Sequence, residues 1–188
     1  WWACFLILTI AGERLELSRM MKHSSFSTSL FIGILSLLLL SLLAIQIHDD
    51  LGWRLLSLGW MGLAMWLIRY DVAQRTIHQT GLTRFIAACL LLGYVWLFLG
   101  GGLALFYGAV KAGTIHDAVL HSIFLGFAFS MIFGHAALIL PSIVGVNIVY
   151  SPFFYSHLAA LHFTLLLRVG GDLTAWADGR RWGALLNS

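Results

Sequence analysis

Charged residues are scarce in this 188-residue sequence, which has 11 Lys and Arg, 8 Asp and Glu and 60% hydrophobic residues. They make up 10% of the chain, whereas a soluble domain carries roughly 25%. Too few are present to cover a surface that faces water, and the net charge of +3 is too small to favour a nucleic-acid partner. The composition therefore predicts a protein whose main partner is the lipid bilayer.

Proline and cysteine are also rare, with two residues of each. The chain has no Pro-rich or Ser-rich linker, so we expect residues 1–188 to form a single domain. Cys4 and Cys89 lie in apolar runs and are predicted to be buried thiols. The sequence contains no CxxCH, Walker, HExxH or GxSxG motif. Covalent haem attachment, a nucleotide-driven pump and a hydrolase are therefore without support.

Long apolar runs dominate what is present, and a membrane-spanning helix needs about 20 such residues. Complete spans are predicted at about 29–47, 55–70, 83–110, 115–140 and 152–169. The predicted fold class is all-α, a polytopic transmembrane helical bundle. Residues 1–10 and 181–188 resemble partial spans, so we expect the chain to be a fragment of a longer protein.

The basic residues between the spans bear on orientation. We call the side of the loop 12–28 side A and the opposite side side B. Side A holds Arg14, Arg19, Lys22, Arg69, Arg75 and Arg84, and side B holds Arg54, Lys111, Arg168, Arg180 and Arg181. The excess favours side A as cytoplasmic, although Arg180 and Arg181 argue the other way.

Histidines are the residues most indicative of chemistry, because an ionisable group inside a span is a functional-site hypothesis. His121 and His135 occupy one face of the helix predicted at 115–140, about 21 Å apart along its axis. Such spacing is typical of helices that ligate two stacked haems. His157 and His162 lie on the next helix, which a short connection predicts to be an antiparallel neighbour.

His135 and His157 are each predicted about 7–8 Å below side A. Two imidazoles at one depth on neighbouring helices would suit the axial ligands of one haem, or two ligands of a copper ion. His162 lies about 7 Å deeper and about 140° around its helix, where it would face another partner or relay protons. A hydrogen-bonded contact between helices is the alternative for each histidine.

A second group of polar residues is predicted on side B. His48 ends the first span and His116 opens the fourth, so the two would form a second metal or haem-edge site, or else simply polar residues of the interface. Arg168 lies near the side-B end of the fifth span. It would bind haem propionates, or else reach to the surface or pair with Asp172.

The segments DAVLHSIFLGF at 117–127 and MIFGH at 131–135, followed by the histidines of the fifth span, resemble the NnrS family of haem- and copper-containing membrane proteins. A more distant resemblance is to the catalytic subunit of haem–copper oxidases. The end of the second span at Arg69-Tyr70-Asp71 also fits the NnrS family. The sequence lacks the paired His-His and the His-x-His of the oxidases, so the resemblance does not extend to a dinuclear haem–copper centre.

The resemblance implies haem binding, a bacterial inner membrane and a link to nitrogen-oxide stress. NnrS-like proteins are also longer, in agreement with a fragment. The leading hypothesis is therefore a b-type haem- or copper-binding membrane protein of respiratory or nitrogen-oxide-response type, with an unidentified redox partner. Its predicted cofactor-binding residues are His135, His157, His121, His162 and Arg168, and its predicted metal ligands are His135, His157, His116 and His48.

Two alternatives stay open. The first is a transporter or channel-like protein in which intramembrane histidines carry protons or line a substrate path, with a helix break at the triplet Gly100-Gly101-Gly102. The second is a structural membrane subunit whose histidines only bond neighbouring helices.

Overall fold

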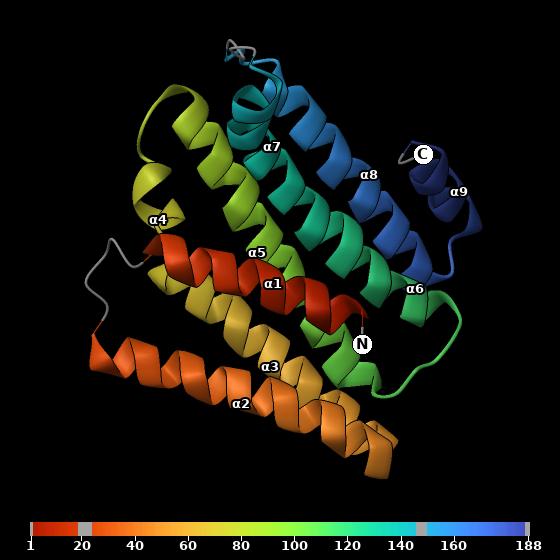
Figure 1. Ribbon diagram of the computed structural model, residues 1–188. Helices are drawn as coiled ribbons and strands as arrows, with labels where there is room; N and C mark the ends of the chain where they lie inside the picture. Colours follow the sequence, from red (N-terminus) through yellow and green to blue (C-terminus); the bar gives the residue numbers. More distant parts are fainter. Residues whose placement is uncertain (1, 19–23, 146–149, 187–188) are drawn as a thin grey trace.

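The computed structural model describes residues 2–18, 24–145 and 150–186, and no strand occurs among them (Figure 1). Its helices are α1 (Trp2–Ser18), α2 (Ser25–Ile47), α3 (Asp49–Tyr70), α4 (Ala73–Thr76), α5 (Gly81–Tyr107), α6 (Thr114–His121), the π-helix η1 (Ser122–Ala128), α7 (Phe129–Val144), α8 (Phe154–Thr174) and α9 (Ala177–Leu186). The all-α prediction is confirmed.

Four of the described helices are long and apolar enough to cross a membrane. They cover Ser25–Ile47, Asp49–Tyr70, Gly81–Tyr107 and Thr114–Ala137. The prediction of five such spans is not confirmed, because α8 is not among them although it has 21 residues. His157, His162 and Arg168 lower its hydropathy. Length and composition nevertheless indicate a membrane protein.

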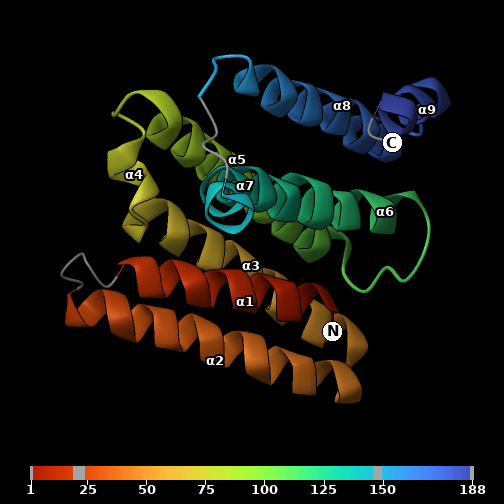
Figure 2. The same cartoon turned by 45° about the horizontal axis from the view of Figure 1, so that its top comes forward.

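The helices pack mainly with their neighbours along the chain. α2 packs on α3, α3 on α5, and α5 on the continuous rod α6–η1–α7 (Figures 1 and 2). α8 lies beside this rod, α9 folds back against α8, and α1 contacts α3 and η1. Most core side chains belong to one cluster that extends from α1 to α7.

The first and last described helices both pack against other helices of the bundle. α1 does not stop near residue 10 but continues to Ser18. α9 has 10 residues and packs against α8. The partial span at 181–188 stays a prediction. A Cβ at Gly183 would lie 2.7 Å from the backbone nitrogen of Arg168. The absence of a side chain at Gly183 therefore permits α9 to pack closely against α8.

Glycines bring α5 close to its neighbours instead of breaking it. α5 is one uninterrupted helix through Gly100, Gly101 and Gly102, so the predicted break is wrong. A Cβ at Gly100 would lie 3.1 Å from Ser122 Cβ, and a Cβ at Gly101 would lie 3.1 Å from the backbone oxygen of Ser57. Two faces of the triplet therefore receive η1 and α3.

The helical irregularity lies in the rod α6–η1–α7. Seven residues, Ser122–Ala128, form the π-helix, a local widening that often occurs at functional sites. The Ser122 hydroxyl donates to the Ala118 oxygen at 2.8 Å, and the Ser130 hydroxyl donates to the Gly126 oxygen at 2.6 Å. A Cβ at Gly126 would lie 2.4 Å from Trp96 Cγ. The wide turn is therefore packed directly against the indole of α5.

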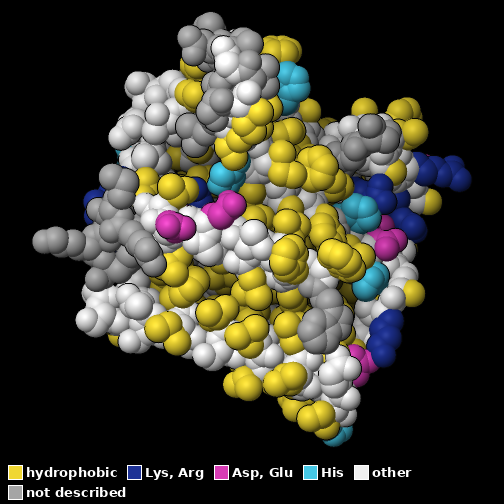
Figure 3. Space-filling view, viewed as in Figure 1, with side chains coloured by type: hydrophobic (Ala, Val, Ile, Leu, Met, Phe, Trp, Pro, Cys, Tyr) yellow, Lys and Arg dark blue, Asp and Glu magenta, His cyan; other side chains and the backbone are white. Residues whose placement is uncertain are grey.

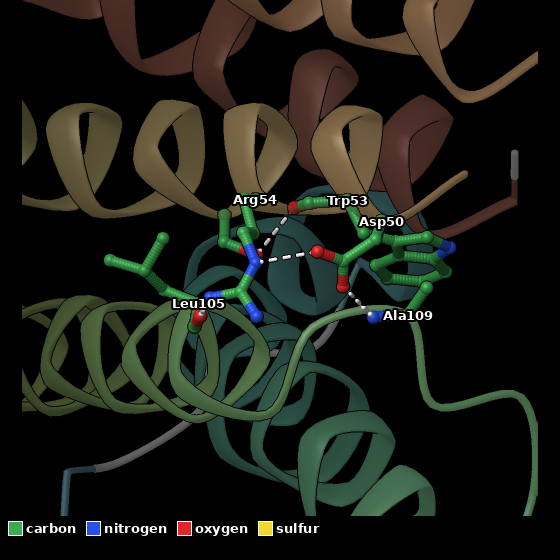
Figure 4. A network of polar contacts seen from close by, with 6 residues as sticks. Asp50, Trp53, Arg54, Leu105 and Ala109 are labelled. Carbon is green, nitrogen blue, oxygen red and sulfur yellow. Dashed lines mark hydrogen bonds and ion pairs between the residues drawn. The ribbon is translucent and has the colours of Figure 1, made fainter. Parts of the chain in front are cut away.

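A charged network joins α3 to the end of α5 on side B (Figure 4). Arg54 Nε contacts Asp50 Oδ2 at 2.8 Å, and Arg54 also donates to the Leu105 oxygen at 2.8 Å. The Ala109 N–H donates to Asp50 Oδ1 at 3.1 Å. The guanidinium thus occupies the carbonyl end of α5, where a positive charge is favourable.

Candidate functional site

The predicted ligand pair is not assembled. His135 Nδ1 lies 2.6 Å from the Met131 oxygen on its own helix, and its Nε2 lies 3.9 Å from Glu13 on α1. His157 is exposed on α8 and packs edge-on against Phe153, with ring centroids 5.0 Å apart. Each histidine therefore has its own partners, on different sides of α7.

A pocket between α7 and α8 explains this separation. It has a volume of about 270 Å³ and is lined by His157 together with Phe133, Ala136, Ala137 and Leu140 of α7. These α7 residues follow helical spacing on one face, and His135 projects from the opposite face. A haem or a copper ion held by both rings does not fit this arrangement.

His162 connects α8 to α5. The Trp96 indole N–H donates to His162 Nδ1 at 2.8 Å, and the two rings are nearly parallel, with an interplanar angle of 9°. An indole N–H only donates, so Nδ1 accepts and the ring proton is on Nε2. A metal-bound histidine instead donates from its free nitrogen. This geometry fits a contact between helices and does not fit a ligand.

The side-B histidines are also separate. His48 is exposed at the junction of α2 and α3, and Asp49 forms an ion pair with Lys111. His116 Nδ1 lies 2.8 Å from the backbone oxygen of Val110, and His121 Nδ1 lies 2.5 Å from the backbone oxygen of Asp117. Within the described ranges no three His, Cys, Asp or Glu side chains form a group that could hold a metal ion.

The structure instead assembles a buried polar group that we call the core cluster: Arg14 of α1, Asp71 at the end of α3 and Tyr94 at the midpoint of α5. The three residues are 7%, 3% and 0% exposed. The Tyr94 hydroxyl donates to Asp71 Oδ2 at 3.1 Å, and the Ala73 N–H donates to Asp71 Oδ1 at 2.7 Å. The charge of Arg14 lies close enough to interact with Tyr94.

The next residue on α1 continues the polar set toward α7. Glu13 precedes Arg14 and faces His135, whose Nε2 is buried and has no hydrogen-bond partner. The His135 Nδ1–H is directed at the Met131 backbone oxygen, so Nε2 is the ring nitrogen that faces α1. Acidic and histidine side chains also lie next to each other on this face in Figure 3. α1 therefore joins two sets of titratable groups.

A second polar site, the side-B pocket, lies between α6, α8 and α9. It has a volume of about 400 Å³ and is lined by Asp117, Arg168, Asp172, Ala177, Arg180, Arg181 and Ala184. The ion pair of Asp172 is formed with Arg180, at 3.0 Å, and not with Arg168 as one prediction had it. Asp172 Oδ2 and Arg168 Nε are buried and have no hydrogen-bond partner.

The whole chain, residues 1–188, matches the model of a family described as a domain of unknown function, DUF8744. The chain belongs to this family. Neither the curated proteins nor the solved structures contain a match to it. The resemblance to NnrS-like proteins therefore stays a prediction.

The spacing of the histidines gives no signal for the core cluster. The charge pattern places Arg14 in a loop, whereas the structure places it in α1 as a buried residue. One signal was available in the sequence: Tyr94 places a hydroxyl group in the middle of an apolar run. A buried hydroxyl needs a partner, and the only way to find Asp71 as that partner was through the fold.

Proposed function

We propose that this chain belongs to a membrane protein that moves protons through the bilayer, and that the core cluster is part of the path. The proposal takes up the transporter-like alternative in a changed form. The observation that carries it is the hydrogen bond between Tyr94 and Asp71, buried beside Arg14 where the end of α3 meets α5.

Placement of the charges supports this function. Ionisable groups in a membrane interior are costly, and where they occur they mark ion paths or proton relays. Packing alone would be served by apolar side chains of similar volume, because a buried ion pair rarely adds net stability. The Asp71 carboxylate accepts hydrogen bonds from the Tyr94 hydroxyl and the Ala73 N–H, and the Arg14 cation lies close to Tyr94, so three polar groups from different helices meet in one buried place.

Glu13 and His135 extend the relay. Glu13 Oε2 and His135 Nε2 are 3.9 Å apart. A small movement of α1 would bring them within hydrogen-bond distance, where a proton could pass directly between them. We further propose that α8 is a fifth crossing, since it lies alongside the rod α6–η1–α7 in both ribbon views (Figures 1 and 2). A bacterial inner membrane is part of the proposal and follows from the resemblance to NnrS-like proteins.

The test is proton flux in liposomes that contain the purified full-length protein and an entrapped pH-sensitive dye. A potassium gradient with valinomycin supplies the driving potential. We expect flux well above that of empty liposomes, with a loss of about tenfold or more in Asp71→Asn, because the amide cannot carry the proton. Asp178→Asn on the exposed part of α9 is the matched control and should leave flux unchanged.

Two results would overturn the proposal. One is a flux equal to that of empty liposomes for the unaltered protein. The other is an Asp71→Asn variant that is folded by gel filtration and helical content and retains full flux. In that case the core cluster only holds the helices together.

A second candidate function keeps one predicted ligand. His135 Nε2 is buried and has no hydrogen-bond partner, while Nδ1 is directed at the Met131 backbone oxygen, and an imidazole that ligates a metal is held by its other nitrogen in this way. We propose it as a single-histidine haem or copper ligand, without His157. An absorption spectrum of protein from haem-replete cells tests this: a Soret band should vanish in His135→Ala and persist in His157→Ala. Metal-free, colourless protein would refute it.

A further inference from the structure

The side-B pocket is independent of the core cluster and has a composition of its own. Three arginines and two aspartates meet in about 400 Å³ between α6, α8 and α9, a volume within the range of small-molecule sites. Figure 3 shows basic, acidic and histidine side chains gathered on the right of the molecule, over the ends of these helices.

Two buried atoms in this pocket lack partners. Asp172 has only 4% of its side chain exposed; its Oδ1 is paired with Arg180, and its Oδ2 has no hydrogen-bond partner. Arg168 Nε is likewise buried without one. An unpaired buried charge-bearing atom is costly. A ligand that offers an acceptor to Arg168 and a donor to Asp172 would satisfy both at once.

The remaining charges extend this two-sided pattern. Arg181 adds a second cation on α9, and Asp117 adds a second carboxylate on the first turn of α6. The two arginines suit the oxygens of a phosphate, which guanidinium groups bind in a bidentate manner. The two carboxylates suit an ammonium group. A simple anion would leave Asp172 Oδ2 without a partner.

The pocket also lies where lipid headgroups are found. α6 begins at Thr114, at the side-B end of a candidate span. α9 exposes Trp182, Leu185 and Leu186 beside its arginines, the pattern of a short helix at a membrane surface. Trp176 just before α9 is exposed as well, and Trp is enriched at this level of the bilayer.

We infer that the side-B pocket binds a phosphoethanolamine group, with the phosphate on Arg168 and Arg181 and the ammonium on Asp117 and Asp172. The position of α9 indicates the headgroup of a membrane phospholipid as the source. The site would hold one lipid against α8 and α9.

The test measures binding to the purified full-length protein, delipidated in detergent, by native mass spectrometry. The probes are dihexanoyl phosphatidylethanolamine, dihexanoyl phosphatidylcholine, free O-phosphoethanolamine and inorganic phosphate. We expect the ethanolamine lipid to bind about tenfold or more tightly than the choline lipid, because a trimethylated nitrogen donates no hydrogen bond to the carboxylates. Tighter binding of the lipid than of free O-phosphoethanolamine assigns the source to the bilayer, and equal binding assigns it to the soluble compound.

Variants locate the site. Arg168→Gln should weaken the binding of both lipids about tenfold, and Asp117→Asn should reduce the preference for the ethanolamine lipid. Arg75→Gln on the exposed face of α4 is the matched control and should change nothing. Asp117→Asn avoids the buried ion pair of Asp172, so its folding is not at stake. Equal binding of the two lipids, or of inorganic phosphate and the ethanolamine lipid, would overturn the inference.

Discussion

Tyr94→Phe is the sharpest test of how the core cluster contributes to the fold. The substitution removes one oxygen and leaves the ring, so it creates almost no cavity. Asp71, which is 3% exposed, loses the donor at 3.1 Å from its Oδ2. Water cannot replace that donor in a fully buried site. Any loss of stability therefore reports on the hydrogen bond.

The expected loss follows from the charge on Asp71. Hydrogen bonds between membrane helices contribute about 0.6 kcal/mol on average, whereas hydrogen bonds to charged groups contribute about 1.5–3 kcal/mol. We expect Tyr94→Phe to lower the free energy of unfolding by about 1.5–3 kcal/mol. The unfolding equilibrium constant then rises by a factor of about 10 to 140.

Equilibrium unfolding in mixed micelles, followed by circular dichroism, measures this change. Tyr107→Phe is the matched control, because Tyr107 lies on the same helix and is 41% exposed. Asp71→Asn combined with Tyr94→Phe completes a double-mutant cycle. The coupling energy should be about 1 kcal/mol or more, since a hydrogen bond to a charged group is worth about 1.5–3 kcal/mol. A loss equal to that of Tyr107→Phe would show that the hydrogen bond between Tyr94 and Asp71 does not stabilise the fold.

Two further predictions concern packing and topology. Gly126→Ala should destabilise the protein by about 1–3 kcal/mol, because its Cβ would lie 2.4 Å from Trp96 Cγ. Gly102→Ala is the control and should not destabilise the protein, because nothing lies within 4 Å of its Cβ. Equal losses of stability in the same unfolding assay would contradict the packing of η1. If α8 crosses the membrane, Ser151→Cys and Thr174→Cys should react with an impermeant maleimide from opposite sides of sealed vesicles. Labelling of both from one side would show that α8 does not cross.

The apolar runs predicted most of the helices, because only a helix satisfies every backbone group within lipid. α2, α3, α5 and the rod α6–η1–α7 were all foreseen, with boundaries that moved by a few residues. The π-turn of η1 was not foreseen, since it depends on how Gly126 packs against Trp96. The return of α9 to α8 was not foreseen for a related reason, since it rests on glycine contacts that exist only in the folded chain.

The histidines illustrate the limit for the site. Spacing along α7 and α8 predicted that His135 and His157 share a depth, but depth does not fix the direction of a ring. His135 is directed at Glu13 on α1, a helix that sequence reasoning had regarded as a fragment followed by a loop. The partner of a side chain is a property of three-dimensional packing, so spacing within one helix could not identify it.

The sequence by itself determined that this protein is a bundle of helices suited to a lipid bilayer, because the hydropathy and the length of a helix depend only on residues close together in the chain. It also determined that a few polar groups must be buried, because the apolar runs contain them. Only the tertiary structure decided which groups meet. Asp71 and Tyr94 come together through the packing of α3 on α5. Arg14 joins them because α1 packs on α3. A buried charge is stabilised only by a partner within a few ångströms, and distant parts of the chain reach that separation only in the fold.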